Sequence, residues 1–161
     1  MSGVRQLTRS DIPEIANLFI DVFRSGAVSQ ERIVCEYMEK VYFEAPWSDP
    51  NIGSLVSTDK SGEIIGFLGV FPRRVWSDGR CFNVAVPGNF MFRQEARSAY
   101  PLGAVQLIRE FLAGPQDLSI SDTATEESRK LWEVCGGDTA RLYSFHWYYP
   151  VRPFSHMLHE I

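Results

Sequence analysis

The fold of this chain is decided by residues 90–113, which read FMFRQEARSAYPLGAVQLIREFLA. An apolar strand ending at Phe92 runs into a polar turn, and an amphipathic helix follows. Pro101 is expected to open that helix, because proline disfavours helical dihedrals at Tyr100 and is itself well tolerated at the first helical position. The stretch therefore predicts a strand that delivers the N-terminus of a helix.

This predicted helix start has the properties of an anion site. The first N–H groups of a helix have no partner within it, and the helix dipole favours negative charge there. The predicted free donors are the N–H groups of Leu102, Gly103 and Ala104, and Gly103 has no Cβ to keep a phosphate away. Arg93 and Arg97 lie just upstream and could add charge-assisted hydrogen bonds. Two interpretations stay open: a site for a phosphate-bearing ligand, or a well-formed helix start with two solvated arginines.

Size and composition indicate one globular domain. The chain has 161 residues, of which 45% are hydrophobic and 13% aromatic, enough for a substantial core. Its formal net charge of -4 argues against a nucleic-acid-binding surface. Residues 93–109 reverse that balance with three arginines and one glutamate, a local basic patch that suits a small polyanion.

Metal sites, disulfides and membrane spans are not expected. The three cysteines, Cys35, Cys81 and Cys135, are far apart and form no CxxC pair, which favours a reducing compartment. His156 and His159 could pair on a metal, but no third ligand is in sight. The sequence shows no signal peptide and no apolar run long enough to span a bilayer, so a cytoplasmic location is predicted.

The periodicity along the chain predicts an α/β fold of the α+β kind, in the order β-α-α-β-β-β-α-β-α-β. The mixed central sheet is expected to be mostly antiparallel and flanked by helices. Strands are predicted at residues 4–8, 52–57, 63–76, 80–92, 118–121 and 141–149, and helices at residues 10–23, 29–41, 101–113 and 123–135. Thr123 and Glu126 are expected to form a capping box at the start of the last helix. Gly136 and Gly137 are expected to close the last helix.

Pro87-Gly88 interrupts the strand predicted at residues 80–92. Proline inside a central strand is disfavoured, because it cannot donate to the ladder. A β-bulge accounts for the interruption, and bulges often lie next to active sites. A simple break of the strand is the other interpretation.

The order of elements, with an anion-binding helix start after the fourth strand, resembles the GNAT superfamily of acyl-CoA-dependent N-acyltransferases. The resemblance covers residues 4–149. It is carried by VRQLT at residues 4–8 with DIPEIANLF at 11–19, by GEIIGFLGV at 62–70, and by Leu131-Trp132-Glu133 with Gly136. It implies an acyltransferase domain over residues 1–150, with residues 151–161 as a C-terminal extension that would lead into a further segment.

The resemblance implies transfer of an acyl group, most simply acetyl, from acetyl-CoA or another acyl-CoA to a primary amine of a small molecule. Asn89, Phe90 and Met91 would hold the pantetheine arm, because they follow the Pro87-Gly88 interruption. The other implied contacts to the co-substrate come from the loop, the helix start and the last helix: Arg97, Ser98, Leu102, Gly103, Ala104, Thr125 and Ser128.

The sequence departs from the family in its phosphate loop, which usually reads Gln/Arg-x-x-Gly-x-Gly/Ala. A strict count from Arg97 places Tyr100 and Leu102 at the two small positions. One inserted residue places Pro101 and Gly103 there instead. The helix-start argument still supplies three donors in either alignment.

The catalytic positions depart as well. Trp132 stands where the family often has a tyrosine that protonates the leaving thiolate, and an indole N–H donates a hydrogen bond without giving up its proton. The fourth strand lacks the Asp or Glu that many members use as a base, and Asp122 is the nearest candidate, although a turn role suits it too. Trp132 and Asp122 are therefore the catalytic candidates. The alternative is a non-catalytic GNAT-like module that binds acyl-CoA or a protein partner within a larger protein.

The last predicted strand carries aromatic residues on one face, Tyr143, Phe145, Trp147 and Tyr149. Core packing is the simplest role for them. An acceptor pocket or the interface of a homodimer would also use such a face.

Overall fold

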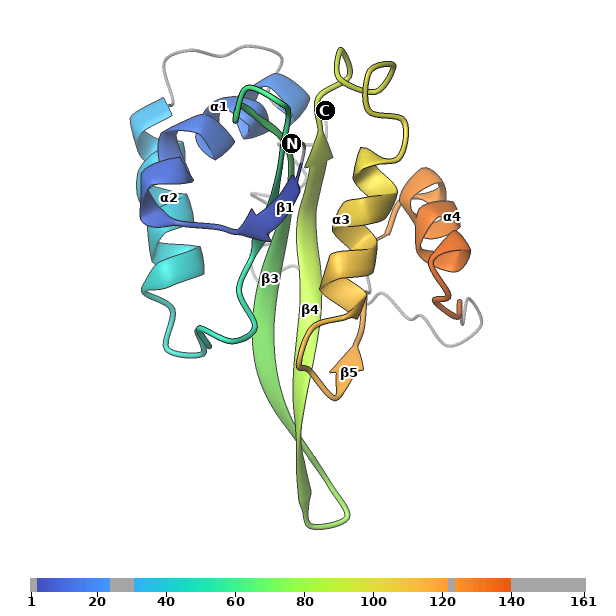
Figure 1. Cartoon of the computed structure of the whole chain (residues 1–161). Coiled ribbons are helices and arrows are strands. Elements are labelled where there is room, and N and C mark those ends of the chain that lie inside the picture. The colour runs from blue at the N-terminus through green and yellow to red at the C-terminus, as the bar shows by residue number, and fades with distance from the viewer. Residues whose placement is uncertain (1–2, 24–30, 122–123, 140–161) are drawn as a thin grey trace, which may run out of the picture.

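The computed structural model describes residues 3–23, 31–121 and 124–139 (Figure 1). Its elements are β1 (Gly3–Gln6), the 3-10 turn η1 (Arg9–Asp11), α1 (Ile12–Phe23), α2 (Glu31–Phe43), β2 (Leu55–Thr58), β3 (Ile64–Ser77), β4 (Arg80–Phe92), α3 (Gly103–Leu112), β5 (Leu118–Ser119) and α4 (Glu126–Val134). This order matches the predicted one as far as α4. The strand predicted at residues 141–149, Asp122, Thr123, the two C-terminal histidines and residues 151–161 lie outside the described residues.

The five strands form one sheet in the order β1-β2-β3-β4-β5. The first three pairs are antiparallel and the β4–β5 pair is parallel, which confirms the mixed, mostly antiparallel sheet. Helices α1 and α2 cover one face of the sheet, while α3 covers the other with α4 beside it (Figure 1). No helix among the described residues is long and apolar enough to cross a bilayer.

Successive side chains of β3 point to opposite faces of the sheet, and this divides the core into two clusters. Phe67 is fully buried beneath α1 and α2, where it meets Ile15 of α1 and Met38 of α2. Its neighbour Leu68 points to the other face and packs against Leu107 of α3. Each face of β3 thus fixes one helical layer, and burial on both faces explains the nearly continuous apolar run in this strand.

Helix α4 ends as the two glycines predict. Gly136 has a φ of 97°, and its N–H donates to Glu133 O at 3.0 Å. The N–H of Gly137 donates to Trp132 O at 2.9 Å. These two bonds make a Schellman motif, which needs a left-handed residue after the helix and therefore favours glycine.

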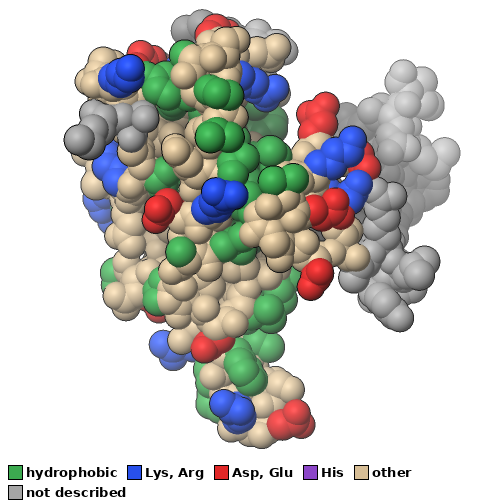
Figure 2. Space-filling model, turned by 45° about the vertical axis from the view of Figure 1, so that its right-hand side comes forward, with side chains coloured by type: hydrophobic (Ala, Val, Ile, Leu, Met, Phe, Trp, Pro, Cys, Tyr) green, Lys and Arg blue, Asp and Glu red, His purple; other side chains and the backbone are tan. Residues whose placement is uncertain are grey.

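The β3–β4 hairpin extends well beyond the body of the sheet and forms the lower lobe of the molecule (Figures 1 and 2). Its turn is made by Asp78 and Gly79, both with positive φ, 49° and 73°. Such a two-residue turn matches the right-handed twist of the strands that it joins.

The N-terminal strand is tied to η1 by an ion pair between the exposed Arg5 and the buried Asp11. Arg5 Nη1 and Nη2 donate to Asp11 Oδ2 and Oδ1 at 2.7 and 2.9 Å. The N–H and hydroxyl of Thr8 also donate to Oδ2, at 2.8 and 2.7 Å. Mainly because of the Arg5 hydrogen bonds, the pKa of Asp11 falls to about 2 from its ordinary value of 3.8.

Replacing Asp11 by Asn is expected to lower the free energy of unfolding by about 1–2 kcal/mol at pH 7. Because the folded-state pKa of Asp11 lies below the unfolded value, its contribution is complete above about pH 4 and is lost as the pH falls toward 2. Urea unfolding of both proteins at pH 7 and pH 2.5 checks this. The difference between them should shrink at pH 2.5, whereas the exposed Asp78→Asn control should change little at either pH.

Candidate functional site

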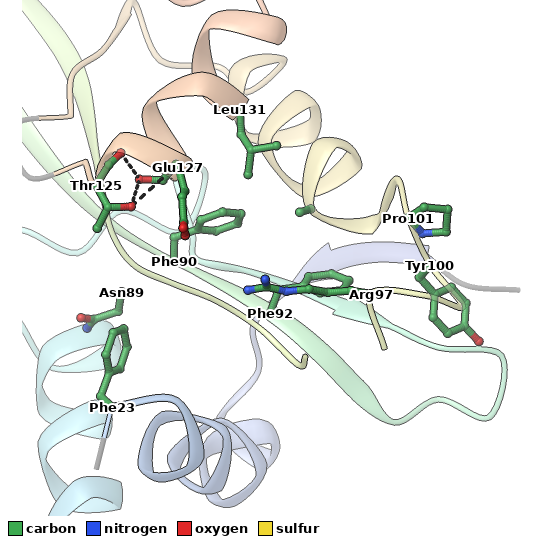
Figure 3. A pocket seen from close by; sticks show the side chains of 12 residues that line it. Phe23, Asn89, Phe90, Phe92, Arg97, Tyr100, Pro101, Thr125, Glu127 and Leu131 are labelled. Carbon is green, nitrogen blue, oxygen red and sulfur yellow. Dashed lines mark hydrogen bonds between the residues drawn. The ribbon is translucent and has the colours of Figure 1, made fainter. Parts of the chain in front are cut away.

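A cleft of about 560 Å³ lies between the end of β4, the start of α3 and the first turns of α4 (Figure 3). Its lining is aromatic and polar, and includes one guanidinium and one carboxylate. The lining residues are Phe23, Asn89, Phe90, Phe92, Arg97, Tyr100, Pro101, Ala104, Thr125, Glu127, Ser128 and Leu131.

The cleft opens where β5 leaves β4. The two strands pair only at Val84–Leu118 and Ala85–Ser119, and Ile120 N–H donates the last bond to Ala85 O at 3.1 Å. Beyond this point β4 is paired with β3 alone among the described residues. One edge of β4 is therefore left to face the cleft with its backbone groups.

A β-bulge follows Pro87-Gly88, which confirms that prediction. Phe67 pairs with Met91 and Gly69 with Gly88, so Asn89 and Phe90 together stand opposite a single residue of β3. Asn89 has a φ of 50°, a left-handed conformation that asparagine tolerates better than most residues.

Pro87 is tolerated in β4 because of where its nitrogen points. Asn83 O and Ala85 O both accept bonds from the β5 side, from Asp117 N–H and Ile120 N–H. Alternation places the Pro87 nitrogen on that same side, where β5 has already diverged. The missing N–H therefore removes no ladder bond.

The extra residue in the bulge changes which backbone N–H groups of β4 point toward the cleft. Arg93 N–H donates to Ile65 O at 2.8 Å across the β3 side. Alternation then directs the N–H groups of Phe92 and Phe90 away from β3, toward the cleft that both residues line. Met91 faces β3, and its side chain is 1% exposed on the opposite face of the sheet. Of the strand residues predicted to face the co-substrate, Met91 therefore does not face the cleft, whereas Phe92 does.

The start of α3 differs from the prediction. The helix begins at Gly103, and Pro101 and Leu102 form a turn before it. The Gly103 N–H is already bonded to Tyr100 O at 3.0 Å. Among the described residues, none accepts a bond from the N–H of Leu102, Ala104 or Val105. The helix start thus offers three free N–H donors, as predicted, but they belong to Leu102, Ala104 and Val105 and not to Gly103.

Gly103 serves packing. A Cβ on it would lie 2.5 Å from Phe92 Cζ, so the glycine makes room for the ring at the foot of the cleft. The structure thus gives Gly103 a packing role that the sequence did not predict, and the close approach of a phosphate to its backbone stays a prediction. Leu102 and Ser98 are exposed and lie outside the lining of the cleft.

The two predicted arginines have different roles. The Arg93 Nε donates to Ile64 O at 3.1 Å, and its guanidinium lies 3.6 Å from Asp21 and 3.7 Å from Glu63. Arg93 is thus a structural cation. The Arg97 side chain extends into the cleft beside Phe92, and its guanidinium has no hydrogen bond or ion pair with any described residue (Figure 3).

Helix α4 forms the opposite wall. Thr125 caps it by accepting the Ser128 N–H at 3.3 Å, and both residues line the cleft. Figure 3 shows Thr125 at this wall. Trp132, one turn further, packs edge-on against Phe111 with ring centroids 5.6 Å apart. It lines a smaller pocket of about 60 Å³ that shares Asn89, Phe90 and Ser128 with the main cleft. The structure thus brings Trp132 next to the bulge.

Two residues at this site had no sequence signal. Glu127 is the cleft's one carboxylate among the described residues, and it extends from α4 toward Phe90 (Figure 3). Tyr42 of α2 accepts a hydrogen bond from Asn89 Nδ2 at 2.8 Å. Both belong to ordinary helical patterns, so only the tertiary structure reveals them. No group of three or more metal-ligating side chains occurs within the described part of the chain.

No protein-family model matches this chain, and no curated protein does. Solved structures do match it along most of its length. Glucosamine-6-phosphate N-acetyltransferase from Arabidopsis thaliana superposes with a TM-score of 0.66 at 13% identity, over 94% of this chain and 99% of that one. A probable acetyltransferase gives 0.67 at 18% identity, over 92% and 97%. This chain has the GNAT fold.

An aminoglycoside 6'-N-acetyltransferase from Acinetobacter baumannii is similar too, with a TM-score of 0.57 at 15% identity, over 92% of this chain and 96% of that one. These identities are low, so the likeness concerns the GNAT fold alone. What the cleft does must be argued from its own residues.

Proposed function

We propose that this GNAT-fold chain is an acyl-CoA-dependent N-acyltransferase that moves a short acyl group to a primary amine of a small molecule. One observation carries the proposal: the cleft joins outward-facing strand amides at a bulge to a helix start with an unpaired arginine. The strand amides at the bulge suit a thioester and the amide-bearing arm that carries it. The helix start with Arg97 suits a pyrophosphate.

The α3 end of the cleft fits the pyrophosphate. Ala104 and Val105 present unbonded N–H groups at the N-terminus of a ten-residue helix, where the dipole favours an anion. Arg97 supplies the positive charge beside them, without a competing partner among the described residues. A guanidinium and free amides are the groups that bind phosphate oxygens in proteins.

The middle of the cleft fits the pantetheine arm. Its amides would pair with the free edge of β4 at Phe90 and Phe92, as an added strand does. Thr125 and Ser128 face this edge from α4. Asn89, Phe90, Arg97, Ala104, Thr125 and Ser128 are therefore retained from the predicted contacts, with Phe92 and Val105 added.

The bulge end supports the chemistry. Acyl-CoA would supply an activated thioester, which an amine attacks with loss of the thiol. The Phe90 N–H can stabilise the negative charge that develops on the carbonyl oxygen. Glu127 can accept the proton that the amine releases. Trp132 can donate a hydrogen bond to the leaving sulfur, but it cannot protonate it.

A second function, a non-catalytic module that binds acyl-CoA, is favoured by Trp132. The indole removes the proton donor that the resemblance implies at this position, and β4 carries no carboxylate. Under this hypothesis the cleft binds acyl-CoA without transferring the acyl group.

Calorimetric titration with acetyl-CoA, followed by an amine panel with thiol detection, separates these functions. We expect acetyl-CoA binding, thiol release that depends on an amine, and a tenfold to hundredfold lower turnover in Glu127→Gln at neutral pH. Binding should be unchanged in that variant, and turnover should recover at alkaline pH, where the amine is already deprotonated.

Glu95→Gln serves as the control, since Glu95 is exposed and lies outside the cleft. Binding without turnover on any amine would favour the second function. A folded chain that binds neither acetyl-CoA nor CoA would contradict both.

A further inference from the structure

A tyrosine from α2 is anchored to the bulge. Asn89 Nδ2 donates to Tyr42 Oη at 2.8 Å, although the two residues are 47 positions apart in the sequence. Asn89 is the residue with the left-handed backbone, and it lines both the main cleft and the small pocket beside it. This single bond therefore links the helical layer on one face of the sheet to the cleft.

The sheet is built to admit the tyrosine. A Cβ on Gly69 would lie 2.4 Å from Tyr42 Oη and 2.8 Å from Gly88 O. Any side chain at this point of β3 would push the hydroxyl away from Asn89. Gly69 is also the residue that pairs with Gly88, immediately before the bulge.

The ring of Tyr42 is held on two sides. It meets Phe67 edge-on, with centroids 5.3 Å apart, and stacks on Phe71 at 5.6 Å. Burial raises the pKa of the Tyr42 hydroxyl well above its ordinary value, so the group stays neutral at every working pH. A rigid, neutral hydroxyl is a fixed acceptor for the Asn89 amide.

Resting on the proposed function, we propose that Tyr42 is a positioning residue that holds Asn89, and with it the bulge, so that the Phe90 N–H faces the thioester carbonyl. A non-glycine residue with positive φ is strained and persists only where its surroundings hold it. If the bulge relaxed, the alternation along β4 would change, and Phe90 would no longer direct its N–H toward the cleft. The hydrogen bond between Tyr42 and Asn89 thus stabilises the bulge, and the bulge sets the direction of the Phe90 N–H.

Tyr42→Phe tests this role, because it keeps both ring contacts and removes only the hydroxyl. We expect the amide NMR signals of Asn89 and Phe90 to shift in the ligand-free variant. We also expect the wild type to bind acetyl-CoA about threefold to tenfold more tightly than CoA, the size of one hydrogen bond to the carbonyl. In Tyr42→Phe this ratio should fall to about one.

Tyr37→Phe is the matched control, since Tyr37 lies on the same helix and is 49% exposed. Asn89→Gly, which tolerates the same φ, should reproduce the loss of acetyl-CoA preference, and the double variant should be no worse than either single variant. Unchanged signals or an unchanged ratio in Tyr42→Phe would overturn the proposal. So would a wild type that binds acetyl-CoA and CoA equally.

Failure of the proposed function would look different. A wild type that binds neither CoA species refutes the acyltransferase and the carbonyl contact together. The NMR comparison needs no ligand, and it then decides by itself whether Tyr42 holds the bulge.

Discussion

An Arg97→Ala/Ala104→Glu variant will bind CoA at least about a hundredfold more weakly than the wild-type chain. Arg97 is the only cation lining the cleft among the described residues, and a charge-assisted hydrogen bond to phosphate contributes about 1.5–3 kcal/mol. The second substitution places a carboxylate beside the free amides of α3, where it competes with and repels the pyrophosphate. Both changes act on the same anion.

Calorimetric titration with CoA measures this loss. The wild-type affinity should also fall as salt is raised, because the contact is electrostatic. Arg32→Ala is the control, since that side chain is 89% exposed on α2 and does not line the cleft. Gly103 is left intact, because a Cβ there would collide with the Phe92 ring, and the loss of binding could then not be assigned to the anion site. Equal affinities of the variant and the wild type would place the anion elsewhere.

Gly69→Ala will lower the free energy of unfolding by about 2–3 kcal/mol, the cost of overpacking a closed site. The new Cβ would lie 2.8 Å from Gly88 O, a backbone atom that moves only if β4 moves. It would also lie 2.4 Å from Tyr42 Oη, which the stacked Phe71 ring holds in place. Neither Gly88 O nor the Tyr42 hydroxyl can move away without disturbing the packing around it.

Urea unfolding measures the effect. Gly53→Ala is a matched control, because a Cβ there meets only the flexible Gln6 side chain at an ordinary 3.5 Å. That control should change stability by less than about 0.5 kcal/mol or raise it slightly, since alanine reduces the entropy of the unfolded chain. A Gly69→Ala protein as stable as the wild type would show that the strand and α2 can separate at this point.

The sequence predicted the elements well because their signals are local. The apolar stripes of the helices, the Gly136-Gly137 stop and the turn at Asp78-Gly79 depend on neighbours in the chain. The bulge was predicted for the same reason, since a proline in a strand is a local conflict. The family resemblance followed from the order of these elements.

The site was harder to predict, and its errors share one cause. Met91 and Phe92 are neighbours in the sequence, and the extra residue in the bulge decides which of them faces the cleft. Gly103 was predicted to have a free N–H, but that N–H is bonded to Tyr100 O, and the glycine makes room for a ring from β4. The side that Met91 faces and the packing role of Gly103 are both decided by the tertiary structure and not by the adjacent sequence.

By itself, the sequence determined the element order, and it predicted the bulge in β4 and a helix start soon after Arg97. The tertiary structure alone decided which amides face the cleft, that Arg97 is free while Arg93 is bound, and that Glu127 and Tyr42 belong to the site. The physical reason is the sequence separation of the contacts involved. Helices, turns and strand breaks arise from contacts a few residues apart, whereas a cleft is made of residues that only strand register and packing bring together.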